Sequence, residues 1–497
     1  MNNEQFYQLI KLGLFKSVET VAQLTPKPTH QMNLARGFAL IEQKRYSEAL
    51  KVIEGIPHGI LAPDDFNRLL EIKLECNINL NVPFKNLAII NSKDISGKQF
   101  NPKIDLLIAQ TLVLSDPKPN PEHPAIKYFL KLLKLYPSAI ELAEKLISIG
   151  ASTTDILSQI SNPIVKQYIN SFVLTKNGNF RESISILEGI LEQVPNSIPV
   201  LSRICVNAVQ CSDMLTFDAC SSRIPYDELD IIDLRAARLK QLRKTDELSN
   251  LVVAALNNNE NSANAWLAFS HLLELNGDPQ RALQTTRKAL LLDRNSRRGY
   301  MRHGELRLQR NDIRKAHSAF IKAHAIHPGL DSYTSLVQCD YLLKDWDSAE
   351  SIALTALNAY PQNGESGSYS IMLMGIAKKI TQPKVAFDLF KKALEKSPEN
   401  TDALSEIIDM RFKENDLDGA VSLLNQYKND KCLLYYNIKM GEILAQKHEY
   451  NSALEYLEKA LQIDNHSERA RELHEQIEEM LRSVDMPEYE EDGISFS

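Results

Sequence analysis

Six alanines recur through the second half of the chain at a nearly constant spacing, each near the start of an amphipathic segment. Successive members are 34, 33, 37, 34 and 33 residues apart, and they are Ala282, Ala316, Ala349, Ala386, Ala420 and Ala453. A fixed period of this length indicates a repeated supersecondary unit that buries its apolar face only by stacking on its neighbours. The spacing therefore predicts a solenoid with one continuous core running through the stacked units.

Other positions of the repeated unit also keep their register. The segments "PKVAFDLFKKALEKSPENT" and "EYNSALEYLEKALQIDNHS" place large and small apolar residues at the same points. Glycines at Gly304 and Gly441 precede the alanine of their unit, and the large residues Phe320 and Leu457 follow it. We expect the small residues to let two paired helices approach closely and the large ones to fill the gap to the next pair. Proline at Pro398 then ends the second helix.

A 34-residue period with these positions resembles the tetratricopeptide repeat, whose unit is an antiparallel helix pair. Weaker matches occur upstream, in "GFALIEQKRYSEAL" and "NGNFRESISILEGILEQVPNS". Glycine and proline are sparse, at 18 and 21 in 497 residues, which favours helix throughout. The predicted fold is all-α, a tetratricopeptide-repeat superhelix.

The expected domain organisation has three parts. Residues 1–160 form N-terminal helical repeats and a dimerisation half, interrupted by a loop excursion at 81–103. Residues 161–482 form the C-terminal superhelix, and residues 483–497 form an acidic disordered tail. The tail is either solvated or a docking segment.

Composition excludes several classes of function. With 43% hydrophobic and 24% charged residues and a net charge of −7, the chain has no global attraction for nucleic acid or anionic lipid. Neither a signal peptide nor an apolar run of ~18 residues is present, so we expect an intracellular protein without membrane contact. The six cysteines are scattered without a CxxC pair, which gives neither a disulfide framework nor a zinc site.

No motif of nucleophilic, metal-dependent or nucleotide-dependent catalysis is present, and the repeats leave no room for a separate catalytic domain. We therefore expect no enzyme activity, no cofactor, no metal and no small-molecule substrate. A superhelix instead offers a concave groove that suits an extended or helical peptide.

One groove candidate is the basic segment "NSRRGYMRHGELRLQRND", in which Arg298, Arg302 and Arg307 are the candidate partner-binding residues. Arg298 and Arg302 are four residues apart and share a helix face. In chaperone-binding tetratricopeptide domains this pair of positions helps to hold a partner's terminal carboxylate, but Ala268 and Asp233 depart from the rest of that clamp. The segment is then either a solvated basic face or a patch for phosphate or carboxylate.

The C-terminal repeats also resemble a more specific family, subunit 7 of the anaphase-promoting complex, or cyclosome. The run "HPGLDSYTSLVQCDYLL" follows a proline turn as in that family, the stretched 37-residue step falls in the same repeat, and an acidic tail follows the last helix. The opening "LIKLGLFKSVETVAQL" is similar to the family's first helix pair. The resemblance covers residues 125–490 and, more faintly, 1–60.

This resemblance implies a non-catalytic scaffold of a cell-cycle ubiquitin ligase, located in the nucleus and cytoplasm, that forms homodimers and stacks on other repeat subunits. A sister repeat subunit of the same complex, a co-chaperone adaptor and a ciliary or cargo-trafficking scaffold remain as alternatives.

The first helix pair is more apolar than packing on one neighbour requires, whereas terminal repeats usually present a polar face. We expect part of this surplus to form a two-fold dimer interface, with the candidates Phe6, Leu9, Leu12, Leu14, Phe15 and Val18. The alternative is that the excursion at 81–103 folds back over it.

Overall fold

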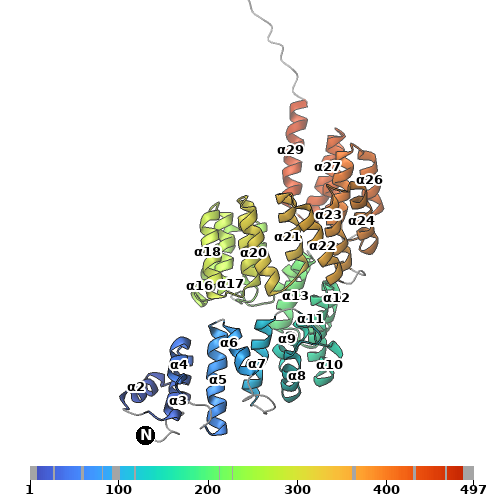
Figure 1. The fold of residues 1–497 in the computed structure, drawn as a ribbon. Helices are drawn as coiled ribbons and strands as arrows, with labels where there is room; N and C mark the ends of the chain where they lie inside the picture. Colours follow the sequence, from blue (N-terminus) through green and yellow to red (C-terminus); the bar gives the residue numbers. More distant parts are fainter. Residues whose placement is uncertain are drawn as a thin grey trace, which may run out of the picture. The chain divides into compact units, whose positions relative to one another are not determined.

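A computed structural model of the chain describes residues 8–25, 28–56, 61–80, 82–91, 101–116, 119–211, 213–226, 228–360, 365–428, 433–464 and 467–484. Within these ranges every regular element is an α-helix and no strand occurs, which confirms the predicted all-α repeat fold (Figure 1). The chain divides into two compact units, Met1–Val173 and Leu174–Ser497, and the division falls inside one helix.

The described part of unit 1 starts with helical residues 8–11, followed by Gly13 in a left-handed conformation. Its further helices are α2 (Phe15–Leu24), α3 (His30–Glu42), α4 (Tyr46–Ile53), α5 (Pro63–Asn79), α6 (Pro83–Ile90), α7 (Pro102–Ser115), α8 (Ala125–Leu135), α9 (Ile140–Ser148), α10 (Thr153–Gln159) and most of α11 (Pro163–Lys176).

The predicted loop excursion at 81–103 was wrong for residues 83–90, which form α6 between α5 and α7. A buried polar side chain explains this packing: Asn86 donates to the Leu74 carbonyl oxygen at 3.0 Å and lies 3.1 Å from the Thr111 hydroxyl. Asn77 donates to the Asn86 side-chain oxygen at 2.8 Å. Residues 92–100 lie outside the described ranges.

Unit 2 is a series of antiparallel helix pairs that ends in one long helix. The helices are α12 (Phe180–Gln193), α13 (Ile198–Gln210), α14 (Met214–Ser221), α15 (Ile232–Gln241), α16 (Thr245–Asn258), α17 (Ala263–Leu275), α18 (Pro279–Leu292), α19 (Arg297–Gln309), α20 (Ile313–Ile326), α21 (Leu330–Leu343), α22 (Trp346–Ala359), α23 (Glu365–Lys378), α24 (Pro383–Lys396), α25 (Thr401–Lys413), α26 (Leu417–Gln426), α27 (Leu433–Gln446), α28 (Tyr450–Ile463) and α29 (Glu468–Val484). Residues 485–497, most of the predicted acidic tail, lie outside the described ranges.

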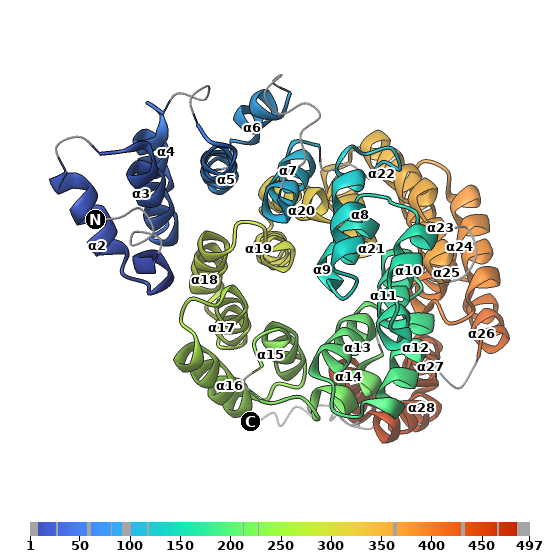
Figure 2. The same cartoon turned by 90° about the horizontal axis from the view of Figure 1, so that it is seen from below.

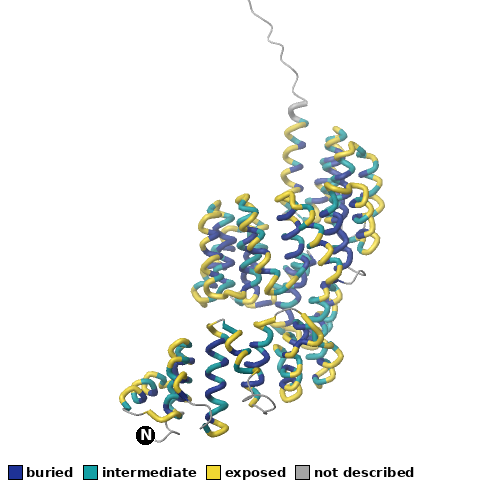
Figure 3. The backbone as a smooth tube through the Cα atoms, viewed as in Figure 1, coloured by how far each residue is buried: buried dark blue, intermediate teal, exposed yellow. Residues whose placement is uncertain are grey.

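The six anchor alanines occupy equivalent places, because each is the fourth residue of the second helix of its pair. All six are completely buried. Figure 3 shows that, in each unit, buried residues line the helix sides that face neighbouring helices. The period read from the sequence is therefore the period of the core.

Large residues of the second helix pack differently from the expectation. A Cβ atom added at Gly304 would lie 2.7 Å from Cζ of Phe320 in the same pair, and one at Gly441 would lie 2.8 Å from Cγ of Leu457. Phe320 also shares a core cluster with Leu336 of the next helix. These large residues thus fill the space inside their own pair as well as the gap to the next one.

Unit 2 curves so that helices far apart in sequence come into contact. Arg181 pairs with Glu399 at 2.5 Å, and Arg243 pairs with Glu468. In the view of Figure 2, α15, α17 and α19 lie on the inner side of the curve and α16 and α18 on its outer side. First helices of the pairs thus line the inner face, as in a superhelix.

Candidate partner-binding surfaces

The three candidate arginines all lie on α19, and each has an acidic partner inside unit 2. Arg298 donates to a carboxylate oxygen of Asp233 at 2.7 Å and to the Asp230 carbonyl oxygen at 2.9 Å. Arg307 pairs with Asp312 at 2.8 Å. These contacts join α19 to the segment that begins α15 and to the turn that leads into α20.

Arg302 is the most buried of the three, with only 5% of its surface exposed. Its Nε donates to the Ser270 hydroxyl oxygen at 3.1 Å, and its guanidinium pairs with Glu274 of α17. A second acid, Glu305, lies 3.4 Å away on the same helix and is half exposed. The charge of Arg302 is therefore balanced within the repeat stack.

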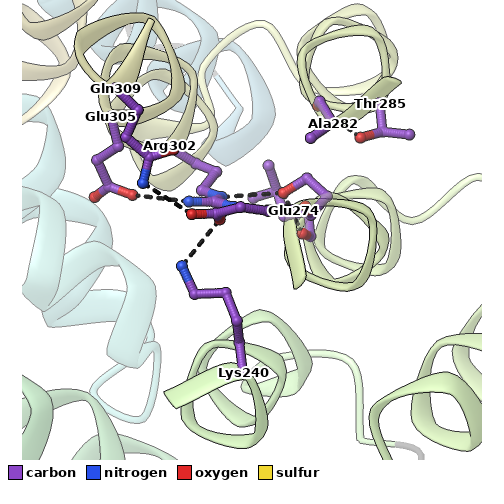
Figure 4. Close-up of polar contacts among 9 residues, drawn as sticks. Lys240, Glu274, Ala282, Thr285, Arg302, Glu305 and Gln309 are labelled. Atoms are coloured by element: carbon purple, nitrogen blue, oxygen red, sulfur yellow. Dashed lines mark hydrogen bonds and ion pairs between the residues drawn. The ribbon is translucent and has the colours of Figure 1, made fainter. Parts of the chain in front are cut away.

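Glu274 is the shared acceptor of this network, which joins α15, α17 and α19 (Figure 4). Besides Arg302, it accepts from Lys240 Nζ at 2.9 Å and from Gln309 Nε2 at 2.8 Å. Burial opposes ionisation of Glu274, but the charge and hydrogen bond of Arg302, with Lys240 and Gln309, lower its pKa to about 2. Sequence reasoning missed Glu274, although a lone acid one repeat before a basic helix was a possible signal.

This placement defines what a ligand would have to do at α19. An incoming carboxylate or phosphate would have to compete with Glu274 for Arg302 and with Asp233 for Arg298. Separating a buried ion pair leaves a desolvated charge, which costs about 3–5 kcal/mol. The role of Arg298, Arg302 and Arg307 in binding a partner stays a prediction.

A groove lies on the first helices of later repeats, α21, α23 and α25. It has a volume of about 400 Å³ and is lined by Thr334, Val337, Gln338, Tyr341, Met372, Leu373, Ile376, Lys379, Asp402, Ser405 and Glu406. Lys379, the residue after α23, pairs with Glu406 of α25. Burial and the nearby Glu406 raise the pKa of Asp402. The lining combines apolar residues such as Met372 and Leu373 with a few charged groups, a composition that fits an extended peptide.

The N-terminal candidates divide between surface and core. Leu12 and Leu14 are 71% and 47% exposed, whereas Leu9 and Phe15 are partly buried against the cluster of α2 and α3. Val18 is completely buried in that cluster and offers no surface to a partner. Phe6 lies outside the described residues.

The alternative was that the excursion at 81–103 covers the apolar surface of the first helix pair, and the structure describes only part of this excursion. The described part of the excursion, α6, packs on α5 and α7. The predicted dimer interface as a whole stays a prediction, and its exposed described members are Leu12 and Leu14.

Among the described residues, no group of three His, Cys, Asp or Glu side chains is arranged to hold a metal ion. None of the described helices is long and apolar enough to cross a membrane. The five cysteines in the described ranges are buried and form no disulfide, and burial raises the pKa of the Cys76 and Cys205 thiols to about 12.

Comparison with known proteins gives one consistent result. The tetratricopeptide repeat model matches residues 434–467. The chain is similar to anaphase-promoting complex subunit 7 of Arabidopsis thaliana, at 22% identity over 97% of this chain and 95% of that protein. It is also similar to the Homo sapiens protein of the same name, at 22% identity over 91% of this chain and 82% of that one.

A solved structure shares the fold. It is the crystal structure of the Cut9–Hcn1 hetero-tetramer of the anaphase-promoting complex, with a TM-score of 0.53, 13% identity and 96% of each chain covered.

Proposed function

We propose, from its relationship to the anaphase-promoting complex subunit 7 proteins, that this chain is a non-catalytic scaffold subunit of that ubiquitin ligase. The similarity runs through nearly the whole of this chain and of the Arabidopsis protein, and this observation carries the proposal. A match limited to one or two repeats would indicate only the fold, because unrelated proteins share the tetratricopeptide unit.

The structure supports a scaffold in two ways. Each helix from α15 to α29 packs on the next, and separate buried clusters follow one another along the stack, which makes unit 2 a long, stacked support. Its inner face has the groove of about 400 Å³ between α21, α23 and α25, where a segment of another subunit fits. The partners that we propose are other tetratricopeptide subunits of the complex.

Affinity purification of the tagged full chain from its own cells, followed by mass spectrometry, tests the proposal. We expect the other repeat subunits, together with cullin-like and RING subunits, to be recovered in stable proportion. Recovery of chaperones or trafficking proteins in their place would favour a co-chaperone or cargo adaptor and would refute the proposal.

We further propose that the chain forms a homodimer through its N-terminal helices. The apolar residues Leu12 and Leu14 are exposed next to the α2 and α3 core, and burying them against a second copy would remove this apolar surface from water. Light scattering of the purified chain should give twice the mass of one copy.

The double substitution Leu12→Glu and Leu14→Glu should give a folded monomer. Leu215→Glu is the matched control, because Leu215 is 82% exposed on α14 of unit 2. A monomeric wild-type chain would exclude the dimer, and a dimer that survives the double substitution would exclude this interface.

Residence in the nucleus and cytoplasm is the corresponding proposal for localisation. Fluorescence microscopy of the tagged chain checks it, and exclusion from the nucleus throughout the cell cycle would contradict it.

A further inference from the structure

One short segment of the chain has a strong excess of basic over acidic residues. Residues 281–325 contain twelve Lys and Arg against three Asp and Glu, in a chain whose net charge is −7. Because such a concentration repels itself, its charges need either internal partners or an external anion.

Much of this charge is neutralised by ion pairs within unit 2. Arg298, Arg302 and Arg307 pair with the carboxylates described above, and Arg297 pairs with Asp331 of α21. Arg281 and Lys288 of α18 pair with Asp278 and Glu260.

Three exposed cations without such partners line a groove between α18, α19 and α20. The groove has a volume of about 450 Å³ and is lined by Arg287, Leu290, Leu291, Tyr300, His303, Lys315, Ser318, Ala319 and Lys322. No carboxylate is among these lining residues, and no described carboxylate pairs with Arg287, Lys315 or Lys322. Asp312, which starts α20, is already paired with Arg307.

His303 lies in this groove, and both burial and the nearby cations affect its pKa. Its Nδ1 lies 2.9 Å from the Thr286 hydroxyl. Burial, followed by the charges of Arg307, Arg287 and Lys322, lowers the pKa of His303 to about 4. The imidazole is therefore neutral at pH 7, and Arg287, Lys315 and Lys322 supply the charge.

The basic surface is confined to two second helices. The second helices on either side, α16 and α22, contain no Lys or Arg and begin with acidic residues, Asp246 and Glu247 in α16 and Asp347 in α22. A nucleic acid needs a basic track that follows many phosphates. Confinement to one groove favours a compact anion carrying about two charges, such as a phosphate monoester.

Apolar groups in the same groove indicate that the anion belongs to a peptide. Leu291 is 73% exposed, and Lys322 lies 5.6 Å from the centre of the Tyr300 ring. We propose that the groove of α18, α19 and α20 binds a phosphorylated serine or threonine in an extended segment of a partner protein. The phosphate lies among Arg287, Lys315 and Lys322, and a neighbouring apolar side chain packs on Leu291.

Fluorescence anisotropy of the full chain with matched peptides tests this proposal. The probes are a short labelled peptide of small neutral residues with a leucine beside one phosphoserine, the same peptide with serine, the same with glutamate, and a single-stranded oligonucleotide. We expect the phosphopeptide to bind at least about tenfold tighter than the serine and glutamate peptides. Equal affinity for the phosphoserine and serine peptides would overturn the proposal, as would an oligonucleotide that competes as well as the phosphopeptide.

Substitutions locate the binding. Arg287→Ala with Lys322→Ala should weaken phosphopeptide binding by about tenfold or more, because two of the three cations are removed. The matched control is Arg314→Ala, an exposed cation of α20 that does not line the groove. Unchanged binding in the double variant, or an equal loss in the control, would contradict the site. These results do not depend on membership of the larger complex.

Discussion

At the residue scale, a glycine in the first helix of a pair sets how closely the second helix approaches. A Cβ atom at Gly304 would lie 2.8 Å from Cδ1 of Phe320, and one at Gly375 would lie equally close to Cδ1 of Phe390. Real Cβ atoms do not approach an aromatic ring this closely, so a methyl group there must displace the ring.

We therefore expect Gly304→Ala to destabilise unit 2 by about 1–3 kcal/mol through overpacking. Gly189→Ala is the control, because no atom lies within 4 Å of a Cβ at this position in α12. There the substitution should stabilise by roughly 0.5–1 kcal/mol through helix propensity. Urea unfolding midpoints measure both, and shifts of the same sign would show that the α19–α20 packing is misplaced.

The Glu274 carboxylate gives a second prediction at this scale. Its pKa is about 2 in the folded chain against an ordinary 4.5, so it stabilises the fold above pH 4.5 and loses this contribution as the pH falls toward 2. Glu274→Gln should cost about 3 kcal/mol at pH 7, because it leaves buried Arg302 without its main partner. In urea unfolding across this pH range, the difference from wild type should shrink on acidification.

Glu305→Gln is the matched control, since Glu305 contacts the same arginine at 3.4 Å but is half exposed. Its cost should stay below about 1 kcal/mol. A pH-independent cost for Glu274→Gln would contradict the ionised network.

At the element scale, the turn inside each pair has a recurrent backbone. One residue with positive φ lies between the first and second helices of most described pairs, and these residues are Lys44, Gly150, Gly178, Arg243, Gly277, Asn311, Lys344, Asn415 and His448. The left-handed residue ends the first helix and reverses the chain, as in common C-terminal helix caps.

The substitution Gly277→Ala tests the cost of a left-handed backbone conformation without any steric clash of the added methyl group. A Cβ at Gly277 would meet no atom within 4 Å, as at Gly189, but its φ is +76°. We expect Gly277→Ala to destabilise by about 1 kcal/mol, whereas Gly189→Ala stabilises. Thermal unfolding of the two variants measures the contrast, and a stabilised Gly277→Ala chain would show that the turn has another conformation.

The sequence was most informative where one residue type is the only one that fits. A buried alanine such as Ala453, or a glycine in close contact such as Gly441 with Leu457, recurs at a fixed spacing in the sequence and can be recognised there. Helix α6 has no such recurring residue. It is stabilised by hydrogen bonds from Asn86 to two other helices, and these partners come together only in the folded chain. The Glu274 network could not be predicted from the sequence for the same reason, because its members come from three helices.

At the scale of the whole molecule, stacked repeats expose much more surface than a compact domain and leave it for partners. The arginines Arg298, Arg302 and Arg307 of α19 pair with carboxylates within unit 2. Two grooves lie apart from these pairs, one lined by α21, α23 and α25 and a basic one lined by α18, α19 and α20. These separate surfaces are the ones on which the proposed scaffold role depends.

A ubiquitin-conjugation assay tests the central claim, a non-catalytic scaffold of a ubiquitin ligase, most directly. With ubiquitin, activating enzyme and conjugating enzyme, the recombinant chain alone should form no conjugates. The tagged chain isolated from its own cells should form them, and the activity should disappear when high salt removes the co-purified subunits. Conjugates formed by the isolated chain, or none formed by the material from cells, would contradict this account.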